Sequence, residues 1–446
     1  MQTLRYRHSY ECKLAVLCFI NVLSIIVFFV SSLSTSINNA AYFSLVLITF
    51  FSFIFVLCNS NVSGYISPIS LFMLSVLIFI LIRPVYYSWD ISENIEQVIS
   101  AGYKVETDYL FHTFFIINLS VTMTLFFYWL TKPLSNRMVI WLPDVYFYNE
   151  KISKMLLLLS FVFASVFLIK SYCAFKILAK VSIFKADAYG LHEHLYLFII
   201  AKYLLICSLA FSKEKNFIFY SFVIFITSIG YMLVGLRGYT VVYFISFVLF
   251  CNLKYKISVK YLLIIALLIT TTSSIVLNYR LGFDANQGLV EIMFKPLLQQ
   301  GATFETVYGA LKYNDDLVQC IPYQQYFSSG INIGTCIDKI RGVNFAEGGG
   351  FATGFYSEMI YFGVIVGFIT LFFFSFLLSI LQTCYEYAKN KTNSKCYSYQ
   401  LVIFLSIPNL VYFARSSLFE FIGKVISVFI FIMMLSVMKK YVLKLT

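Results

Sequence analysis

Apolar runs of about 20 residues recur along this chain, separated by short polar connections. An α-helix needs about 20 apolar residues to cross the bilayer core, whereas the strands of a membrane barrel alternate in hydropathy over about 10 residues. The chain is 60% hydrophobic and only 12% charged, and soluble domains carry about 25% charged residues. We therefore expect an all-α polytopic membrane protein.

The hydropathy pattern predicts 12 transmembrane helices, and the first of these is expected to be an uncleaved span because no small-residue cleavage site follows it. Residues 1–278 hold nine of them, residues 279–355 form one large polar loop, and residues 356–446 hold the last three. The expected limits are 14–33, 41–59, 66–86, 110–130, 154–173, 195–211, 217–236, 239–252, 261–278, 356–381, 398–414 and 421–438.

The basic residues predict the orientation, because short cytoplasmic loops are enriched in lysine and arginine. A cytoplasmic N-terminus gives the best agreement, so we expect both termini in the cytoplasm and the 279–355 loop on the outer face. The net charge of +12 does not indicate nucleic-acid binding, because the basic residues lie mainly in short connections. Lysines alternate with apolar residues in 170–194, which suits either an interfacial helix near anionic lipids or a solvated connector.

Two cysteines, Cys320 and Cys336, lie 16 positions apart in the large polar loop. If that loop faces an oxidising compartment, the pair is expected to form a disulfide, with two free thiols as the alternative. Most of the other cysteines lie in or beside apolar runs, where cysteine acts as a small hydrophobe. Neither a CxxC pair nor an HExxH motif is present, so the sequence gives no support for a metal site.

Four arginines, distant in sequence, fall on the predicted outer face: Arg237, Arg280, Arg341 and Arg415. Arginine presents a permanently charged, planar set of donors that matches phosphate oxygens. A cluster of them could hold a pyrophosphate and stabilise it as a leaving group without a metal. Alternatively, each arginine could extend to the membrane interface or pair with an acid such as Glu420.

A general base could be supplied by Glu358, which follows a glycine-rich stretch and lies one turn into the tenth expected helix. It could take a proton from an acceptor hydroxyl, or it could pair with an arginine. Glu347 and Asp284 are weaker candidates of the same kind. The histidines of the 192–194 segment (HEH) are more typical of structure than of catalysis. Lys202, inside the sixth expected helix, should pair with a carboxylate or line a cavity rather than face lipid.

Several segments together resemble a known family. A GLRG segment contains Arg237, and Arg280 follows the span before the large loop. The loop returns through TGFYSEMIYFGVIVG (353–367), and an ARS segment with Arg415 joins the last two spans. This arrangement resembles the bacterial O-antigen polymerases, the Wzy group, which are related to the O-antigen ligases. The resemblance in topology covers the whole chain, whereas the resemblance in amino-acid sequence rests on short segments.

The resemblance implies a fold similar to the C-type membrane glycosyltransferases and a location in the bacterial inner membrane. It implies transfer of a growing glycan from undecaprenyl pyrophosphate to a lipid-linked repeat unit, without cofactor or metal, and with a chain-length-determining co-polymerase as partner. By analogy, Arg237, Arg280 and Arg415 bind pyrophosphate, with Arg341 and Glu358 as further catalytic candidates. Related ligases carry a histidine in the large loop, and residues 279–355 contain none.

Three other functions are compatible with a chain of this composition. A flippase for the same lipid-linked oligosaccharide would have a similar number of spans, but the long loop and the arginines are unexpected in it. An O-antigen ligase is disfavoured by the missing loop histidine. A membrane acyltransferase would need a catalytic histidine near a span, and His112 has the position without a supporting motif.

Overall fold

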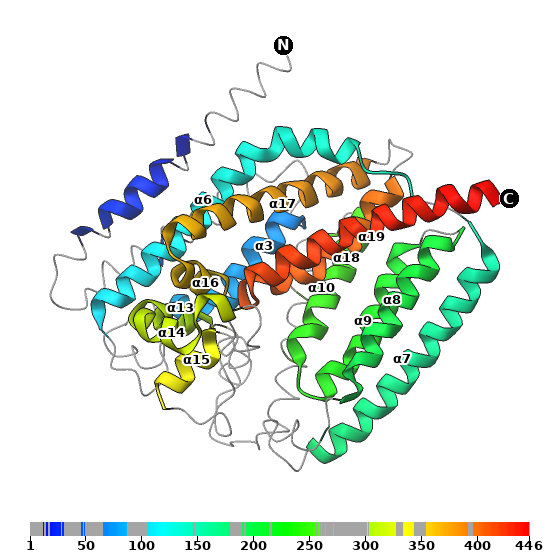
Figure 1. Cartoon of the computed structure of the whole chain (residues 1–446), viewed down its shortest axis with the longest axis horizontal. Helices are drawn as coiled ribbons and strands as arrows, with labels where there is room; N and C mark the ends of the chain where they lie inside the picture. The colour runs from blue at the N-terminus through cyan, green and yellow to red at the C-terminus, as the bar shows by residue number, and fades with distance from the viewer. Residues whose placement is uncertain are drawn as a thin grey trace. The chain divides into compact units, whose positions relative to one another are not determined.

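The computed structural model describes nine segments, together with parts of 12–30 and a few single residues elsewhere: 66–86, 106–145, 148–178, 193–213, 216–255, 303–326, 333–342, 354–390 and 396–445. Every regular element in these segments is helical, as the sequence predicts (Figure 1). The chain divides into two compact units. The first contains Met1–Ile140, Leu298–Thr383 and Phe413–Ile422, and the second contains Trp141–Leu297, Cys384–Tyr412 and Gly423–Thr446.

Within the described residues, seven helices are long and apolar enough to cross a membrane, and three shorter apolar helices accompany them. They occupy positions expected from hydropathy, whereas the expected spans 41–59 and 261–278 lie almost entirely outside the described residues. The seven are Pro68–Tyr86, Tyr109–Ile140, Glu150–Ile177, Glu193–Phe211, Val364–Lys389, Tyr397–Arg415 and Leu418–Lys439, and the three are Cys18–Val27, Phe217–Leu233 and Gly238–Lys254.

Among the described residues of the first unit, two spanning segments come from the N-terminal half. The first consists of α3 (Pro68–Val76), the π-helical turn η1 (Leu77–Leu81) and α4 (Ile82–Tyr86), and α6 (Thr107–Ile140) is the second. Helix α3 begins at Pro68, two residues after the start of the expected span 66–86, because the Ser67 hydroxyl accepts a hydrogen bond from the Ser70 N–H and proline occupies the first helical position.

A core of buried aromatic rings joins several helices of the first unit. Phe413, in the short helix η5 (Phe413–Arg415), stacks on Phe374 with ring centroids 4.2 Å apart. The ring centroids of Phe355 and Phe72 lie 4.5 and 5.5 Å, respectively, from the centroid of Phe413. Aromatic pairs at these separations add to the free energy gained from burying their area. The position of η5 is therefore fixed by packing from three other helices.

The tenth expected helix is two helices rather than one. The sequence predicts a continuous span over 356–381, but α16 (Phe355–Phe362) ends at Gly363 and α17 (Val364–Asn390) begins directly after it. Gly363 has φ of 85°, a left-handed conformation that glycine adopts at little cost and other residues avoid. Glu358 consequently lies in a short helix before the spanning helix, and not one turn into it.

Part of the large polar loop folds into helices of the first unit. They are α13 (Thr303–Lys312), α14 (Asn314–Cys320) and α15 (Ile333–Ile340), with the short turn η4 (Tyr323–Gln325) between the last two. The Cys320–Cys336 disulfide, expected from sequence, joins α14 to α15. A buried ion pair between Arg83 of α4 and the fully buried Glu305 of α13 ties these helices to a spanning segment.

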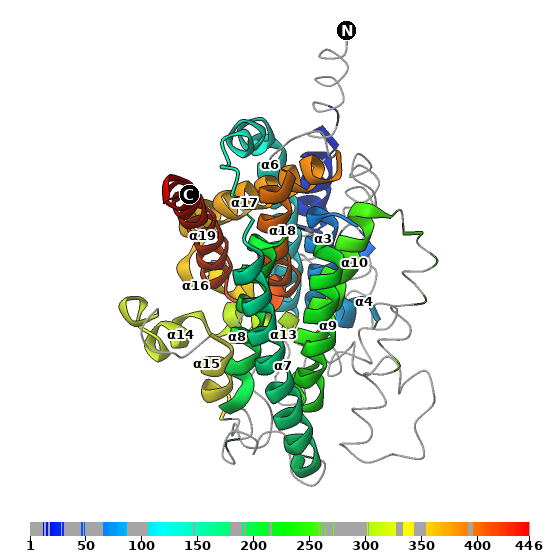
Figure 2. The same cartoon turned by 90° about the vertical axis from the view of Figure 1, so that its right-hand side faces the viewer.

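The second unit contains α7 (Glu150–Leu178), η3 (Glu193–Leu195), α8 (Tyr196–Phe211), α9 (Phe217–Leu233), α10 (Arg237–Lys254) and α18 (Cys396–Tyr412), together with most of α19 (Leu418–Leu445). Helices α7 and α8 lie side by side in Figure 1 and Figure 2. Serine hydroxyls join them: Ser153 donates to the Ser208 carbonyl at 3.0 Å and Ser160 to the Ala201 carbonyl at 2.8 Å. The beginning of the lysine-rich 170–194 segment continues α7 as far as Leu178.

Candidate functional site

Glu358 is the centre of a buried polar cluster in the first unit, and only 1% of its surface is exposed. The Leu418 backbone N–H, at the start of α19, donates to Oε2 at 2.6 Å. The Tyr326 hydroxyl donates to Oε1, and the Ser417 side chain bonds the same carboxyl group. The carboxyl group therefore joins three segments that are far apart in sequence.

The backbone just before Glu358 packs closely against helix α13. Gly354 precedes α16, and a Cβ atom at this position would lie 2.6 Å from the Thr303 side chain of α13. Glycine therefore lets the start of α16 lie directly against the loop helices. This close contact fixes the position of Gly354, which lies four residues before Glu358.

The protonation of Glu358 is shifted by its surroundings. Burial raises the pKa of Glu358 to about 7, while hydrogen bonds from Ser417, Tyr326 and the Leu418 backbone oppose the shift. Burial, together with the nearby Glu358 carboxylate, also raises the pKa of Tyr326, so this phenol stays a hydrogen-bond donor at neutral pH. A carboxyl group with a pKa near neutrality can be a proton acceptor or a switch, but both of its oxygens are already occupied here.

Arg415 lies in the turn formed by residues 413–418, called the Arg415 turn below, and the hydrogen bonds of Glu358 hold this turn in place. It is half-buried at the end of η5, two residues before Ser417. On its N-terminal side, the Ala414 N–H donates to the Ser75 hydroxyl at 3.1 Å, and Phe413 packs in the aromatic core. On its C-terminal side, Glu358 bonds Ser417 and Leu418. The structure thus brings together the 353–367 segment and the Arg415 segment, two of the segments on which the family resemblance rests.

Arg341 has a different environment at the end of α15. Its side chain is 6% exposed and forms an ion pair with Asp338 at 3.8 Å. Pairing with a nearby acid is the alternative that the sequence left open for each arginine. A role for Arg341 in binding pyrophosphate stays a prediction.

Most of the other candidate residues lie outside the part of the chain that the structure describes. Arg280, Asp284, Glu347 and His192 lie outside the described residues, and for Arg237 only the backbone position, at the first residue of α10, is described. His194 has a structural environment, because its Nε2 lies 3.0 Å from the Ser171 hydroxyl and its ring packs against Phe167. His112 is exposed on α6.

Two members of the cluster were not anticipated from the sequence. Tyr326 is 32 positions from Glu358, and nothing distinguishes it among the 34 tyrosines of the chain. Ser417 had a weak signal, since it lies directly after the ARS segment that contains Arg415. Their contribution depends on long-range contacts that local patterns do not record.

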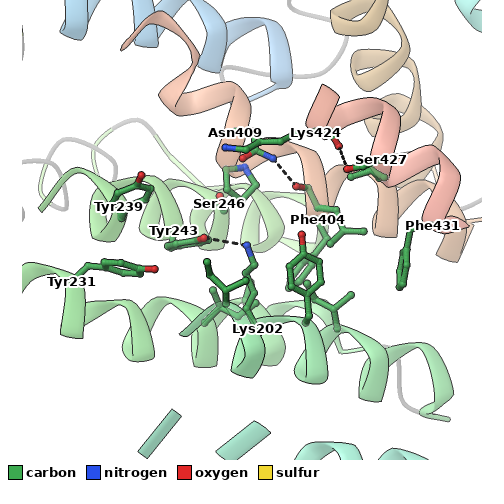
Figure 3. Close-up of a pocket in the computed structure, with 18 of the residues that line it drawn as sticks. Lys202, Tyr231, Tyr239, Tyr243, Ser246, Phe404, Asn409, Lys424, Ser427 and Phe431 are labelled. Atoms are coloured by element: carbon green, nitrogen blue, oxygen red, sulfur yellow. Dashed lines mark hydrogen bonds between the residues drawn. The ribbon is translucent and has the colours of Figure 1, made fainter. Parts of the chain in front are cut away.

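Lys202, in the second unit, follows one of the two expectations for it. Its ammonium group lies 3.4 Å from the Tyr243 hydroxyl and over the rings of Tyr203 and Tyr243, with 5.1 and 5.7 Å to the centroids. Among the described residues, it pairs with no carboxylate. Instead it lines a cavity of about 560 Å³ (Figure 3).

Comparison with known proteins gives one close relative. An O-antigen polymerase of Escherichia coli is 50% identical over 388 residues, which cover 86% of this chain and 87% of the relative. Neither a family model nor a solved structure matches the chain.

Proposed function

We propose that this chain, which belongs to the O-antigen polymerases, transfers a growing glycan from undecaprenyl pyrophosphate to a sugar hydroxyl of a lipid-linked repeat unit. The family and the membrane-spanning helices make it a multi-pass inner-membrane protein of lipopolysaccharide biosynthesis with a polymerising glycosyltransferase activity. The identity of donor and acceptor is our proposal.

In the proposed reaction, the acceptor hydroxyl attacks the anomeric carbon of the growing glycan, and undecaprenyl pyrophosphate leaves. The developing charge on the pyrophosphate must be stabilised, and arginines in a preorganised position can supply this. Arg415 is the best supported of them, because its turn is fixed from both sides by packing and hydrogen bonds. Arg237 and Arg280 are proposed to contribute to the same function. The proposed reaction uses neither a metal nor a nucleotide sugar.

Glu358 is proposed to position this turn. Its two oxygens are engaged by Tyr326 and Leu418, and its surface is almost fully buried. A general base must reach the proton that it accepts, directly or through one water. Glu347 and Asp284 therefore stay alternative candidates for the base, and Arg341 stays a candidate for further stabilisation.

The proposed orientation places both termini in the cytoplasm and the 279–355 loop at the periplasmic face, where the loop would select the glycan. The three-part organisation into an N-terminal membrane part, this loop and a C-terminal membrane part remains our proposal. A chain-length-determining co-polymerase is the proposed partner. The fold is proposed to resemble the C-type glycosyltransferases.

The experiment that tests the function is a gel of surface lipopolysaccharide from a strain that lacks only this gene. We expect the ladder to collapse to lipid A core that carries a single repeat unit, because units are still exported and ligated. If no repeat unit reaches the core, export or ligation has failed, and the flippase or ligase interpretation replaces ours. Expression of the wild-type chain from a plasmid should restore the ladder.

A further inference from the structure

The cavity beside Lys202 lies entirely within the second unit and is built by several of its helices. Lys202 comes from α8, Tyr243 from α10, Asn409 from α18 and Lys424 from α19. Its volume of about 560 Å³ is within the range of about 300–1,000 Å³ that small-molecule sites occupy. This is a space large enough for a ligand, and not a packing defect.

Lys202 has unused hydrogen-bonding capacity in this cavity. It lies near the middle of the spanning helix Glu193–Phe211, where a charged side chain is costly and needs compensation. An ammonium group has three N–H donors, and among the described residues only the Tyr243 hydroxyl accepts from it, at a long 3.4 Å. The two aromatic rings give partial compensation. An anionic ligand would complete the compensation.

The remaining walls of the cavity combine polar groups with a larger apolar area. Tyrosine hydroxyls, the Asn409 amide and the Lys424 side chain line it together with isoleucine and phenylalanine side chains (Figure 3). A free inorganic anion would leave the apolar walls facing empty space or water. A molecule with an anionic group on an apolar chain fits both parts of the lining, and lipids with a phosphate head have this chemistry.

We propose that the cavity around Lys202 binds the phosphate group of a lipid, with the Lys202 ammonium as the direct contact. Two sources share this chemistry: the isoprenyl pyrophosphate of the substrate, and an anionic phospholipid of the membrane. The first source rests on the proposed function, and the second does not. The cavity is lined by residues of the second unit, whereas the Arg415 turn belongs to the first.

The test measures lipid binding to the purified full-length chain in detergent micelles, by titration in native mass spectrometry. The probes are undecaprenyl pyrophosphate and phosphatidylglycerol, measured separately. The variants are Lys202→Met, which removes the charge but keeps an apolar chain, and Lys202→Arg, which keeps the charge. Lys151→Met is the matched control, because Lys151 is an exposed lysine of α7 in the same unit and lies outside the 170–194 segment. If Lys202→Met does not purify as a monodisperse protein, Lys202→Gln replaces it.

We expect Lys202→Met to weaken undecaprenyl pyrophosphate binding by about tenfold or more, as loss of a charged hydrogen bond would. Lys202→Arg should stay within about threefold of wild type, and Lys151→Met should be unchanged. If the same pattern occurs with phosphatidylglycerol alone, the lipid-phosphate site stands and its occupant is a membrane phospholipid. Unchanged binding of both lipids to Lys202→Met overturns the proposal.

These results are independent of the test of the proposed function. Binding is measured without turnover, so a lipopolysaccharide phenotype that refuted the polymerase would leave the lipid result standing. Conversely, unchanged lipid binding would remove the Lys202 site and leave the evidence from the ladder intact.

Discussion

Glu358 in the first unit is a buried ionisable side chain and Lys202 in the second is a partly buried one, and their surroundings satisfy them in opposite ways. Glu358 receives hydrogen bonds from Tyr326, Ser417 and the Leu418 backbone, so its polar capacity is filled from within the protein. Lys202 has one long hydrogen bond and a cavity beside it.

This difference indicates different roles. A buried group whose partners all come from the chain stabilises one arrangement of that chain, and its removal leaves those partners unsatisfied. A partly buried ammonium group with one long hydrogen bond destabilises the empty protein, and an anionic ligand can offset this cost. Stability should therefore depend on Glu358, and ligand affinity on Lys202.

The largest effect is expected for Glu358→Ala. The substitution removes the acceptor of the buried Leu418 N–H and the carboxylate to which the Tyr326 hydroxyl donates, which should lower the free energy of unfolding by about 3 kcal/mol. The measurement is denaturant or thermal unfolding of the purified protein in micelles. Asp316→Ala, at an exposed acid of α14 in the same unit, should change it by less than about 1 kcal/mol. Equal effects of the two substitutions would show that Glu358 holds nothing in place.

Next in size is the effect of Arg415→Ala on polymerisation. The arginine lies on the turn that Glu358 holds, and loss of a charge-stabilising contact should reduce polymer formation by on the order of 100-fold. The free energy of unfolding should fall by less than about 1 kcal/mol, because the electrostatic interactions of a partly exposed side chain are screened by solvent. The readout is the lipopolysaccharide ladder in the deletion strain, with expression checked by immunoblot. A full ladder at normal expression would remove Arg415 from the pyrophosphate site.

Arg280→Ala is expected to abolish the ladder in the same assay while the protein stays folded in the membrane. The substitution removes a proposed phosphate contact rather than core packing. Normal product length from a well-expressed variant would exclude that role for Arg280.

A smaller effect is expected in the pH dependence of stability. The pKa of Glu358 rises from 4.5 to about 7 on burial, so the native state binds this proton more tightly than the unfolded state does. The contribution of Glu358 is then fully present below about pH 4.5 and is lost as the pH rises toward about 7. The Tm of wild type minus the Tm of Glu358→Gln should fall over this window. A difference that stays constant or increases would contradict the buried state of this carboxyl group.

The smallest effect on stability is expected for Lys202→Met. The substitution removes a charge that the empty protein compensates only partly, so the free energy of unfolding should stay within about 1 kcal/mol of wild type or increase. The measurement is the same unfolding experiment, with Lys151→Met as control. A loss as large as that of Glu358→Ala would mean that Lys202 is a structural group like Glu358, and the difference between the two units would disappear.

Much of this fold could be predicted from the sequence, because spanning a membrane imposes a pattern on every residue of a helix. The positions of the described spans follow from hydropathy, and the Cys320–Cys336 disulfide is the expected one of two alternatives for cysteines that share the polar loop. The division of the tenth span did not, since it depends on the φ angle of one residue, Gly363, inside an apolar run. A hydropathy average does not distinguish glycine in a turn from glycine in a helix.

The candidate site was predicted less completely. The sequence singled out Glu358 and Arg415 separately, and the structure joins their segments through Ser417 and Leu418. Tyr326 could not be anticipated, because its contact with Glu358 crosses from the polar loop to another helix. For Lys202, the cost of a charge in a membrane predicted either a partner or a cavity, and only the packing of the second unit shows which of the two is present.

The most direct test of these opposite roles is complementation of the deletion strain with Glu358→Gln and Lys202→Met, each at wild-type expression. Glutamine can accept from Leu418 and donate to Tyr326, so Glu358→Gln should restore the lipopolysaccharide ladder. Lys202→Met should fold but lack the proposed contact with the pyrophosphate of the substrate, so most core should carry a single repeat unit. A ladder restored by Lys202→Met and lost with Glu358→Gln would contradict our account, because the carboxylate would then be the reacting group and the cavity lysine dispensable.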